Sequence, residues 1–262
     1  MSEKCANQFF DYLRNAMNIY NQIIEKTTSG KKQLAVLIDP DKPSVQQLEE
    51  IALMANQSAV DSFFIGGSLI TNDNIDNCVK ILKKNSRIPV IIFPGNTMQV
   101  NQNADGILFL SLISGRNAEM LIGKHVIAAP YIRQYGLEVI PTGYMLIESG
   151  KPTTALYMSN SLPIPSDKDD IAVCTAIAGE MLGLKMIYMD AGSGAQNHIS
   201  FSMIEKVKNN ISVPLIIGGG IRTAQVAKDI YNAGADMIVV GNAIEKNTSL
   251  IPEITKIISC FS

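Results

Sequence analysis

Three glycine-rich segments, each at the end of an apolar run, have the residue types and spacing that suit phosphate binding. They are Ala191-Gly192-Ser193-Gly194, Gly218-Gly219-Gly220 and Gly241-Asn242. Glycine weakens strands and helices, so its recurrence at strand ends needs a reason. Bare backbone lets N–H groups approach phosphate oxygens, and a helix that starts there adds unpaired donors. Turn geometry alone would explain one such run, but two at adjacent strand ends favour a phosphate site.

A carboxylate and a hydroxyl follow two neighbouring apolar runs near the start of the chain. They are Asp39 in LIDPDK and Ser68 in IGGS. Oxygen ligands of this kind suit Mg²⁺, which completes its shell with water and phosphate. Taken alone, Asp39 is about equally well explained by an Asx turn or a helix cap before Pro40. Asp41 and Lys42, the next charged residues, are predicted to lie at the surface.

Asp190 ends the sixth apolar run, directly before the AGSG segment. A lone carboxylate beside a phosphate site is a candidate general base or an anchor for a substrate hydroxyl. Its alternative role is hydrogen bonding within the turn that follows. Tyr188 lies two residues earlier and therefore points to the same side of a strand. Its phenol can reach a ligand there or fill a layer of the core.

Zinc, nucleophilic and Schiff-base chemistries lack their usual residues. The two histidines, His125 and His198, have no cysteine or carboxylate at zinc-ligand spacing. The four cysteines are far apart and form no CxxC motif, which indicates reduced thiols rather than a metal site or disulfides. Neither a Ser/His/Asp arrangement nor a lysine at a strand end is evident in the sequence.

Eight short apolar runs separated by spacers must position these residues. Each run is apolar on both faces, as in a parallel strand that is covered on both sides. The spacer NTMQVNQNA, between the third and fourth runs, is too short and too polar for a packed helix. The pattern predicts a modified (β/α)8 TIM barrel whose third helix is replaced by a loop, with a doubly wound sheet as the alternative. The runs cover 34–39, 62–68, 89–95, 106–112, 137–147, 185–192, 213–220 and 235–242.

Capping residues and apolar spacing predict the helices between the runs. Ser44 is placed to cap one helix, and Thr223 and Gly234 mark the two ends of another. A surface turn at 163–170 leads into a helix over 171–182. Residues 1–30 have amphipathic spacing and are expected to form a helical extension of a single barrel domain, 1–262.

Composition and charge narrow the classes of function. The chain has 262 residues, of which 47% are hydrophobic and 18% charged, with a net charge of −2. That length suits one large α/β barrel, and the absence of a basic surplus gives no indication of a nucleic-acid partner. We find no signal-peptide pattern and no apolar run of membrane-spanning length, so we expect a cytoplasmic protein.

Five motifs together resemble one family. LIDPDK, FIGGS, YMDAGSGA, IIGGGIRT and VVGNAIE occur in this order, over roughly residues 30–250, and are similar to those of the geranylgeranylglyceryl phosphate synthase family, which includes the bacterial heptaprenylglyceryl phosphate synthases. A glycine run followed by GN would fit many phosphate-binding barrels, but the whole set is specific. The resemblance implies a barrel whose third helix is replaced by a loop, in agreement with the short third spacer.

The resemblance also implies an activity and roles for residues. It implies transfer of a prenyl group, geranylgeranyl above all, from a prenyl diphosphate to the 3-hydroxyl of sn-glycerol 1-phosphate, with Mg²⁺ as cofactor and a dimer or hexamer as the assembly. Asp190 would be the general base, and Asp39 and Ser68 would hold Mg²⁺. Glycerol phosphate would be bound by Tyr188, Met189, Ala191, Gly192, Ser193, Gly194, Gly218, Gly219, Gly241 and Asn242.

Two positions distinguish this chain within the family that it resembles. The family usually has Glu where this chain has Asp190, and Asp is one methylene shorter. The bacterial branch often has Lys two residues before the metal-binding Asp, whereas this chain has Leu37 and is closer to the archaeal type. Phe93, Phe109, Tyr131 and Tyr144 are candidates to line a prenyl channel. The alternatives are a sugar-phosphate isomerase or aldolase, or a barrel that binds a phosphate ligand without catalysis.

Overall fold

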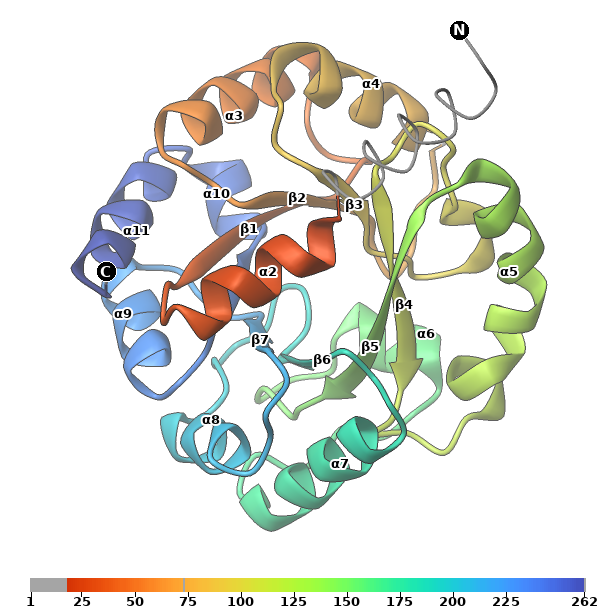
Figure 1. The fold of residues 1–262 in the computed structure, drawn as a ribbon, viewed down its shortest axis with the longest axis vertical. Coiled ribbons are helices and arrows are strands. Elements are labelled where there is room, and N and C mark those ends of the chain that lie inside the picture. The colour runs from red at the N-terminus through yellow and green to blue at the C-terminus, as the bar shows by residue number, and fades with distance from the viewer. Residues whose placement is uncertain (1–17, 73, 262) are drawn as a thin grey trace, which may run out of the picture.

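Eight parallel strands pair in chain order into a closed barrel, and the pairing of β1 with β8 completes the ring (Figure 1). The computed structural model describes residues 18–72 and 74–261. This closure confirms the predicted TIM barrel and excludes the doubly wound sheet. The strands are β1 (Gln33–Ile38), β2 (Ser62–Ile65), β3 (Val90–Ile92), β4 (Gly106–Leu112), β5 (Glu138–Leu146), β6 (Met186–Asp190), β7 (Leu215–Gly218) and β8 (Met237–Val240).

Helices surround the barrel, except between β3 and β4, where one 3₁₀ turn, η1 (Thr97–Gln99), takes the place of the third helix. The predicted replacement of that helix is therefore confirmed. Within the described residues, no helix combines the length and the apolarity needed to cross a bilayer. The helices are α2 (Ile19–Thr28), α3 (Val45–Gln57), α4 (Ile75–Asn85), the π turn η2 (Glu119–Gly123), α5 (Lys124–Tyr135), α6 (Thr154–Ser159), α7 (Asp169–Met181), α8 (Phe201–Lys208), α9 (Ala224–Asn232), α10 (Asn242–Lys246), α11 (Leu250–Ile258) and η3 (Ser259–Phe261).

The predicted helix caps are present. The Ser44 hydroxyl accepts a hydrogen bond from the Gln47 N–H, and the Gln47 side chain accepts one from the Ser44 N–H, so that α3 begins with a capping box. Thr223 caps α9 in the same way through the Val226 N–H. These local bonds satisfy backbone donors that the first turn of a helix leaves unpaired.

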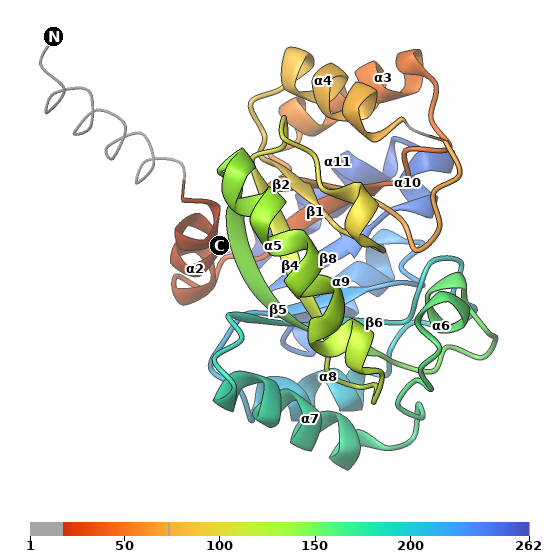
Figure 2. The ribbon, with the colours of Figure 1, turned by 90° about the vertical axis from the view of Figure 1, so that its right-hand side faces the viewer.

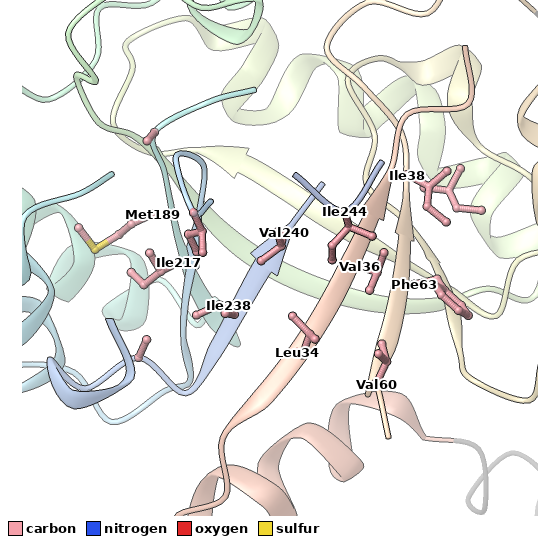
Figure 3. Packing of buried hydrophobic residues seen from close by; sticks show 14 of the residues in the cluster. Leu34, Val36, Ile38, Val60, Phe63, Met189, Ile217, Ile238, Val240 and Ile244 are labelled. Atoms are coloured by element: carbon pink, nitrogen blue, oxygen red, sulfur yellow. The ribbon is translucent and has the colours of Figure 1, made fainter. Parts of the chain in front are cut away.

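Alternation along the strands divides the core into an inner and an outer layer. Met186, Tyr188 and Asp190 of β6 point into the barrel, where the first two join an inner cluster. Ile187 and Met189 point outward into the larger cluster between strands and helices. Figure 3 shows part of this outer layer, in which side chains of β1, β7 and β8 pack beside one another.

Helix α2 closes the N-terminal end of the barrel. Ile19 and Ile23 pack into the inner cluster, and the Glu138 carboxylate accepts hydrogen bonds from the Ile19 and Tyr20 N–H groups at 2.6 and 2.8 Å. Figure 2 shows α2 and α6 on opposite sides of the barrel. The predicted N-terminal helix is thus present over Ile19–Thr28, and its part at 1–17 lies outside the described residues.

Three aspartates stabilise the same end of the barrel in one pattern. Asp61, Asp105 and Asp236 each directly precede an even-numbered strand and accept the N–H of the neighbouring odd-numbered strand, at 2.7, 2.9 and 2.8 Å. Each also pairs with a lysine from a helix. The backbone hydrogen bond and the lysine charge together offset the cost of burying each carboxylate. The pattern therefore attaches strands to helices at the end opposite to the strand carboxyl termini.

We expect Asp236→Ala to lower the free energy of unfolding by about 1–3 kcal/mol, because it leaves the Leu215 N–H and the Lys208 ammonium without their acceptor. Urea unfolding of the two proteins would measure the difference. Asp167→Ala is the matched control, since that side chain is 76% exposed and lies 3.8 Å from its lysine; it should change stability by less than about 0.5 kcal/mol. Equal stability of Asp236→Ala and the wild type would contradict the assignment.

Candidate active site

A cavity of about 700 Å³ opens at the carboxyl ends of the strands. Its polar half is formed by the loops after β1, β2, β6, β7 and β8, and its apolar half by β4, η2, α5 and α6. In a (β/α)8 barrel this end carries the ligand site, because loops from all eight strands converge there. The arrangement brings together a site for anions and a wall suited to a hydrocarbon.

The glycine run after β7 has a steric explanation in the structure. A Cβ on Gly218 would lie 2.3 Å from the Tyr188 hydroxyl, and one on Gly219 would lie 2.8 Å from the Gly192 nitrogen. A Cβ on Gly220 would meet the backbone of Asn197 at 2.7 Å. Gly219 and Gly220 also have φ angles of +82° and +72°, at which other residues are strained. The loops after β6 and β7 therefore pack backbone to backbone, and Gly192, Gly194, Gly219 and Gly220 of these loops line the cavity.

Most of the residues predicted to bind phosphate line this cavity, and three do not. Met189 packs with the outer hydrophobic cluster because side chains alternate along its strand, and it does not line the cavity (Figure 3). Ala191 is buried, and its N–H donates to the Gly218 carbonyl at 2.9 Å. Gly218 lies under the Tyr188 ring, so these three residues lie outside the cavity lining. The residues that line the cavity are Tyr188, Gly192, Ser193, Gly194, Gly219, Gly241 and Asn242.

Asp190 lies at the floor of the mouth with both carboxylate oxygens engaged. The Tyr144 hydroxyl donates to Oδ2 at 2.6 Å, and the Gly192 N–H donates to Oδ1 at 2.7 Å. Burial raises the pKa of Asp190, and these two hydrogen bonds oppose that rise. Burial also holds the pKa of Tyr144 well above its usual value, so that phenol remains a donor. Each carboxylate oxygen keeps a second lone pair for another proton.

Tyr144 is the partner of Asp190 that sequence patterns did not identify. It lies on β5 opposite Tyr188, and its ring meets the Tyr188 ring edge-on, with centroids 5.5 Å apart. The sequence suggested Tyr144 only as a channel residue. In the register of β5 and β6, Tyr144 lies opposite Tyr188 and Leu146 lies opposite Asp190, so the Tyr144 hydroxyl can reach the Asp190 carboxylate. This register is set by the pairing of strands in the barrel, which a single sequence segment does not reveal.

Asp39 and Ser68 lie together at the other side of the mouth. Both line the cavity, and the Asp39 carboxylate lies beside Gly67 in the loop that carries Ser68. Asp39 Oδ1 also accepts the Asp41 N–H at 3.2 Å, so the turn contact expected before Pro40 is present while the residue lines the cavity. Among the described residues, no group of three or more His, Cys, Asp or Glu side chains gathers as metal ligands. A metal ion here would take its remaining oxygens from substrate and water, as Mg²⁺ does.

Lys42 and Glu245 complete the polar half, and Lys42 lies at the surface as the sequence predicts, with 44% of its side chain exposed. The Lys42 ammonium lies 3.1 Å from Asp39 Oδ2 and 3.3 Å from Glu245 Oε2, and both side chains line the cavity. Its position three residues after Asp39 was the available signal, because such spacing lets a lysine fold back on an aspartate. Glu245 belongs to α10 and offered no comparable signal.

The apolar half extends from the mouth along β4 toward α5. Phe93, Phe109 and Tyr144 line the cavity as predicted, whereas Tyr131 does not and is 54% exposed. His125 packs edge-on against Phe109, and burial lowers its pKa, so this imidazole is uncharged at neutral pH. The other apolar lining residues include Leu108, Leu110, Leu112, Met120, Ala128, Ile132, Leu146, Ala155 and Met158.

These features define a class of protein: a phosphate-binding (β/α)8 barrel with a buried carboxylate and an apolar channel at its mouth. The chain belongs to the PcrB family, whose model matches residues 25–258.

Similarity to individual proteins, in sequence and in structure, supports membership of that family. A geranylgeranylglyceryl phosphate synthase of Chitinophaga pinensis is 55% identical over 90% of this chain and 93% of its own length. One from the archaeon Methanosphaera stadtmanae is 40% identical over 92% of this chain and 100% of its own. A crystal structure of the Thermoplasma acidophilum synthase in complex with sn-glycerol 1-phosphate has a TM-score of 0.87 at 31% identity, covering 92% of this chain and 98% of that chain.

We expect Asn242→Asp to weaken the binding of inorganic phosphate at least about tenfold. The substitution keeps the shape of the side chain but adds a negative charge beside the glycine-rich loops after β6, β7 and β8, here called the phosphate loops. Isothermal calorimetry would measure the affinity. Asn210→Asp is the matched control, since that residue lies at the exposed end of α8 and bonds Lys206. An unchanged affinity in Asn242→Asp would place the anion elsewhere.

Proposed function

We propose that this protein transfers a prenyl group, most suitably geranylgeranyl, from its diphosphate to the 3-hydroxyl of sn-glycerol 1-phosphate. The reaction forms an ether bond and releases diphosphate. The observation that carries the proposal is one cavity in which Asp190 lies between the phosphate loops and the apolar channel. Relatives of 40% to 55% identity that bear the synthase name support it. An isomerase, an aldolase or a simple phosphate binder would have no use for the channel.

The phosphate loops hold and orient glycerol phosphate. Backbone N–H groups of the loops after β6, β7 and β8 donate to its phosphate, and Ser193 and Asn242 add side-chain donors. Fixing the phosphate in this way leaves the 3-hydroxyl to reach toward the floor of the mouth. Orientation of the two reactants removes entropy from the transfer step.

Asp190 accepts the proton of the 3-hydroxyl as that oxygen attacks C1 of the prenyl diphosphate. The Tyr144 hydroxyl and the Gly192 N–H hold the carboxylate in place. Its burial raises its pKa, which makes it a better proton acceptor than an exposed aspartate. The C1–oxygen bond to diphosphate breaks as the new ether bond forms, and the electron pair leaves with diphosphate.

Asp39 and Ser68 would hold Mg²⁺ against the diphosphate. A bound Mg²⁺ supplies charge neutralisation to the leaving group. The donor set, one carboxylate and one hydroxyl at a mouth that opens to solvent, suits this metal because substrate oxygens and water complete its shell. The prenyl chain lies along the wall formed by β4 and α5.

An assay with radiolabelled sn-glycerol 1-phosphate and geranylgeranyl diphosphate tests the proposal. Label is expected to pass into an organic-extractable ether lipid when protein, both substrates and Mg²⁺ are present. The enantiomer sn-glycerol 3-phosphate serves as the control substrate. Tight binding of glycerol phosphate without transfer to any prenyl diphosphate would support the simple binder instead.

Asp190→Asn should lower kcat on the order of 10²–10⁴-fold, because the amide cannot accept the proton. The affinity for glycerol phosphate should change little, since the phosphate loops keep their N–H groups. Asp190→Glu separates two geometries: retained activity indicates a strand end that accepts either length, and lost activity indicates one adjusted to Asp. Full activity in Asp190→Asn would remove Asp190 from the mechanism.

Tyr144→Phe should shift the acid limb of the pH–rate profile to higher pH. The base form of Asp190 is lost as pH falls through its pKa, and the Tyr144 hydrogen bond lowers that pKa by stabilising the charged form. Removing the hydroxyl therefore raises the pKa further and protonates Asp190 at a higher pH. The profile of kcat/KM from acid to neutral pH measures the shift; a shift to lower pH would contradict it.

Asp39→Asn should largely abolish activity and its response to Mg²⁺ while the protein stays folded. Asp41→Asn is the matched control, because Asp41 accepts hydrogen bonds from the Thr71 and Asn72 N–H groups and does not line the cavity. It should keep its Mg²⁺ response. Activity measured against Mg²⁺ concentration distinguishes the two, and near-normal activity of Asp39→Asn would leave it with the turn role alone.

A further inference from the structure

Lys42 occupies a position between the two polar regions of the mouth. Its ammonium lies 3.1 Å from Asp39 Oδ2, on the metal side, and donates to Asn242 Oδ1 at 2.8 Å, on the phosphate side. The two regions come from opposite ends of the chain, in the loops after β1 and β8. The Lys42 side chain therefore contacts both regions.

Glu245 holds Lys42 in that position. Its Oε2 lies 3.3 Å from the ammonium, and its Oε1 accepts the Asp39 N–H at 3.2 Å. The Glu245 side chain is 12% exposed, so it is far more constrained than a surface carboxylate. An ordinary lysine is protonated far above neutral pH, and two carboxylates lie beside this ammonium. Lys42 therefore carries its charge at neutral pH.

The contact with Lys42 determines which way the Asn242 amide faces. An ammonium is a donor without acceptor capacity, so the oxygen of the amide must face it. The NH₂ group of Asn242 then faces the phosphate loops, where it donates to the Ser193 hydroxyl at 3.2 Å. Rotation of the amide would put an oxygen beside a bound phosphate and an NH₂ beside an ammonium, both of which are repulsive.

We infer that Lys42, held by Glu245, is a positioning residue that orients Asn242 for glycerol phosphate and Asp39 for the diphosphate side. The inference rests on the proposed function and adds a structural link between its two substrate subsites. Side chains that are fixed before the ligand arrives bind it better, because less conformational freedom is lost on binding. The inference predicts that Lys42 acts on glycerol phosphate through Asn242 rather than by its charge alone.

A double-mutant cycle on binding tests this inference without turnover. Calorimetry with sn-glycerol 1-phosphate, in the absence of metal and prenyl diphosphate, would compare the wild type, Lys42→Met, Asn242→Leu and the double variant. Each single variant should bind on the order of tenfold more weakly, the loss of about one charge-assisted hydrogen bond. The double variant should bind no more weakly than the weaker single variant. Additive losses would mean that Lys42 acts independently, and would overturn the inference.

Two further variants keep the test independent of folding and of general charge. Glu245→Gln preserves shape and should weaken glycerol phosphate binding in the same direction, by less than Lys42→Met. Lys206→Met removes an equivalent charge from α8, where Lys206 pairs with Asp169, and should leave binding unchanged. Wild-type protein that binds no glycerol phosphate would overturn the proposed function, whereas wild-type binding with unchanged Lys42→Met and Glu245→Gln would overturn this inference alone.

Discussion

Closure of the sheet by the pairing of β1 with β8 is the constraint on which the site depends. It brings the loop after Ile38 beside the loop after Val240, although the two are separated by most of the chain. Lys42 and Asn242 meet at 2.8 Å as a result. Every other pair in the ring connects consecutive strands. The pairing of β1 with β8 therefore turns an ordered row of loops into a single mouth, with Asp39 on one side of it and the glycine loops on the other.

The two ends of the barrel have different physical roles. At the end covered by α2, aspartates such as Asp61 and Asp236 attach strands to one another and to helices through hydrogen bonds and ion pairs. At the other end, polar groups face a cavity and keep unused lone pairs and N–H groups. Stability and ligand binding are thus supplied by separate sets of residues, which lets the mouth carry a buried carboxylate such as Asp190.

Replacement of the third helix by η1 has a consequence for chemistry. A helix after β3 would cover the outer edge of β3 and β4, whereas a short turn leaves the cavity continuous from Asp190 to the wall of β4 and α5. The polar mouth and the apolar channel are therefore parts of one space. A substrate with a charged head and a hydrocarbon tail fits such a space because each part meets an environment of its own polarity.

The sequence by itself determined the barrel and its missing helix, and it predicted a site at the glycine loops, Asp39, Ser68 and Asp190, because apolar periodicity, turn residues and motif order are local properties. Met189 and Gly218 do not line the cavity, since neighbours in a motif can point to opposite faces of a strand or pack beneath a ring. Tyr144, Lys42 and Glu245 depended on tertiary structure. Their partners come from other strands, and strand register and ring closure, which no local pattern encodes, decide which side chains meet.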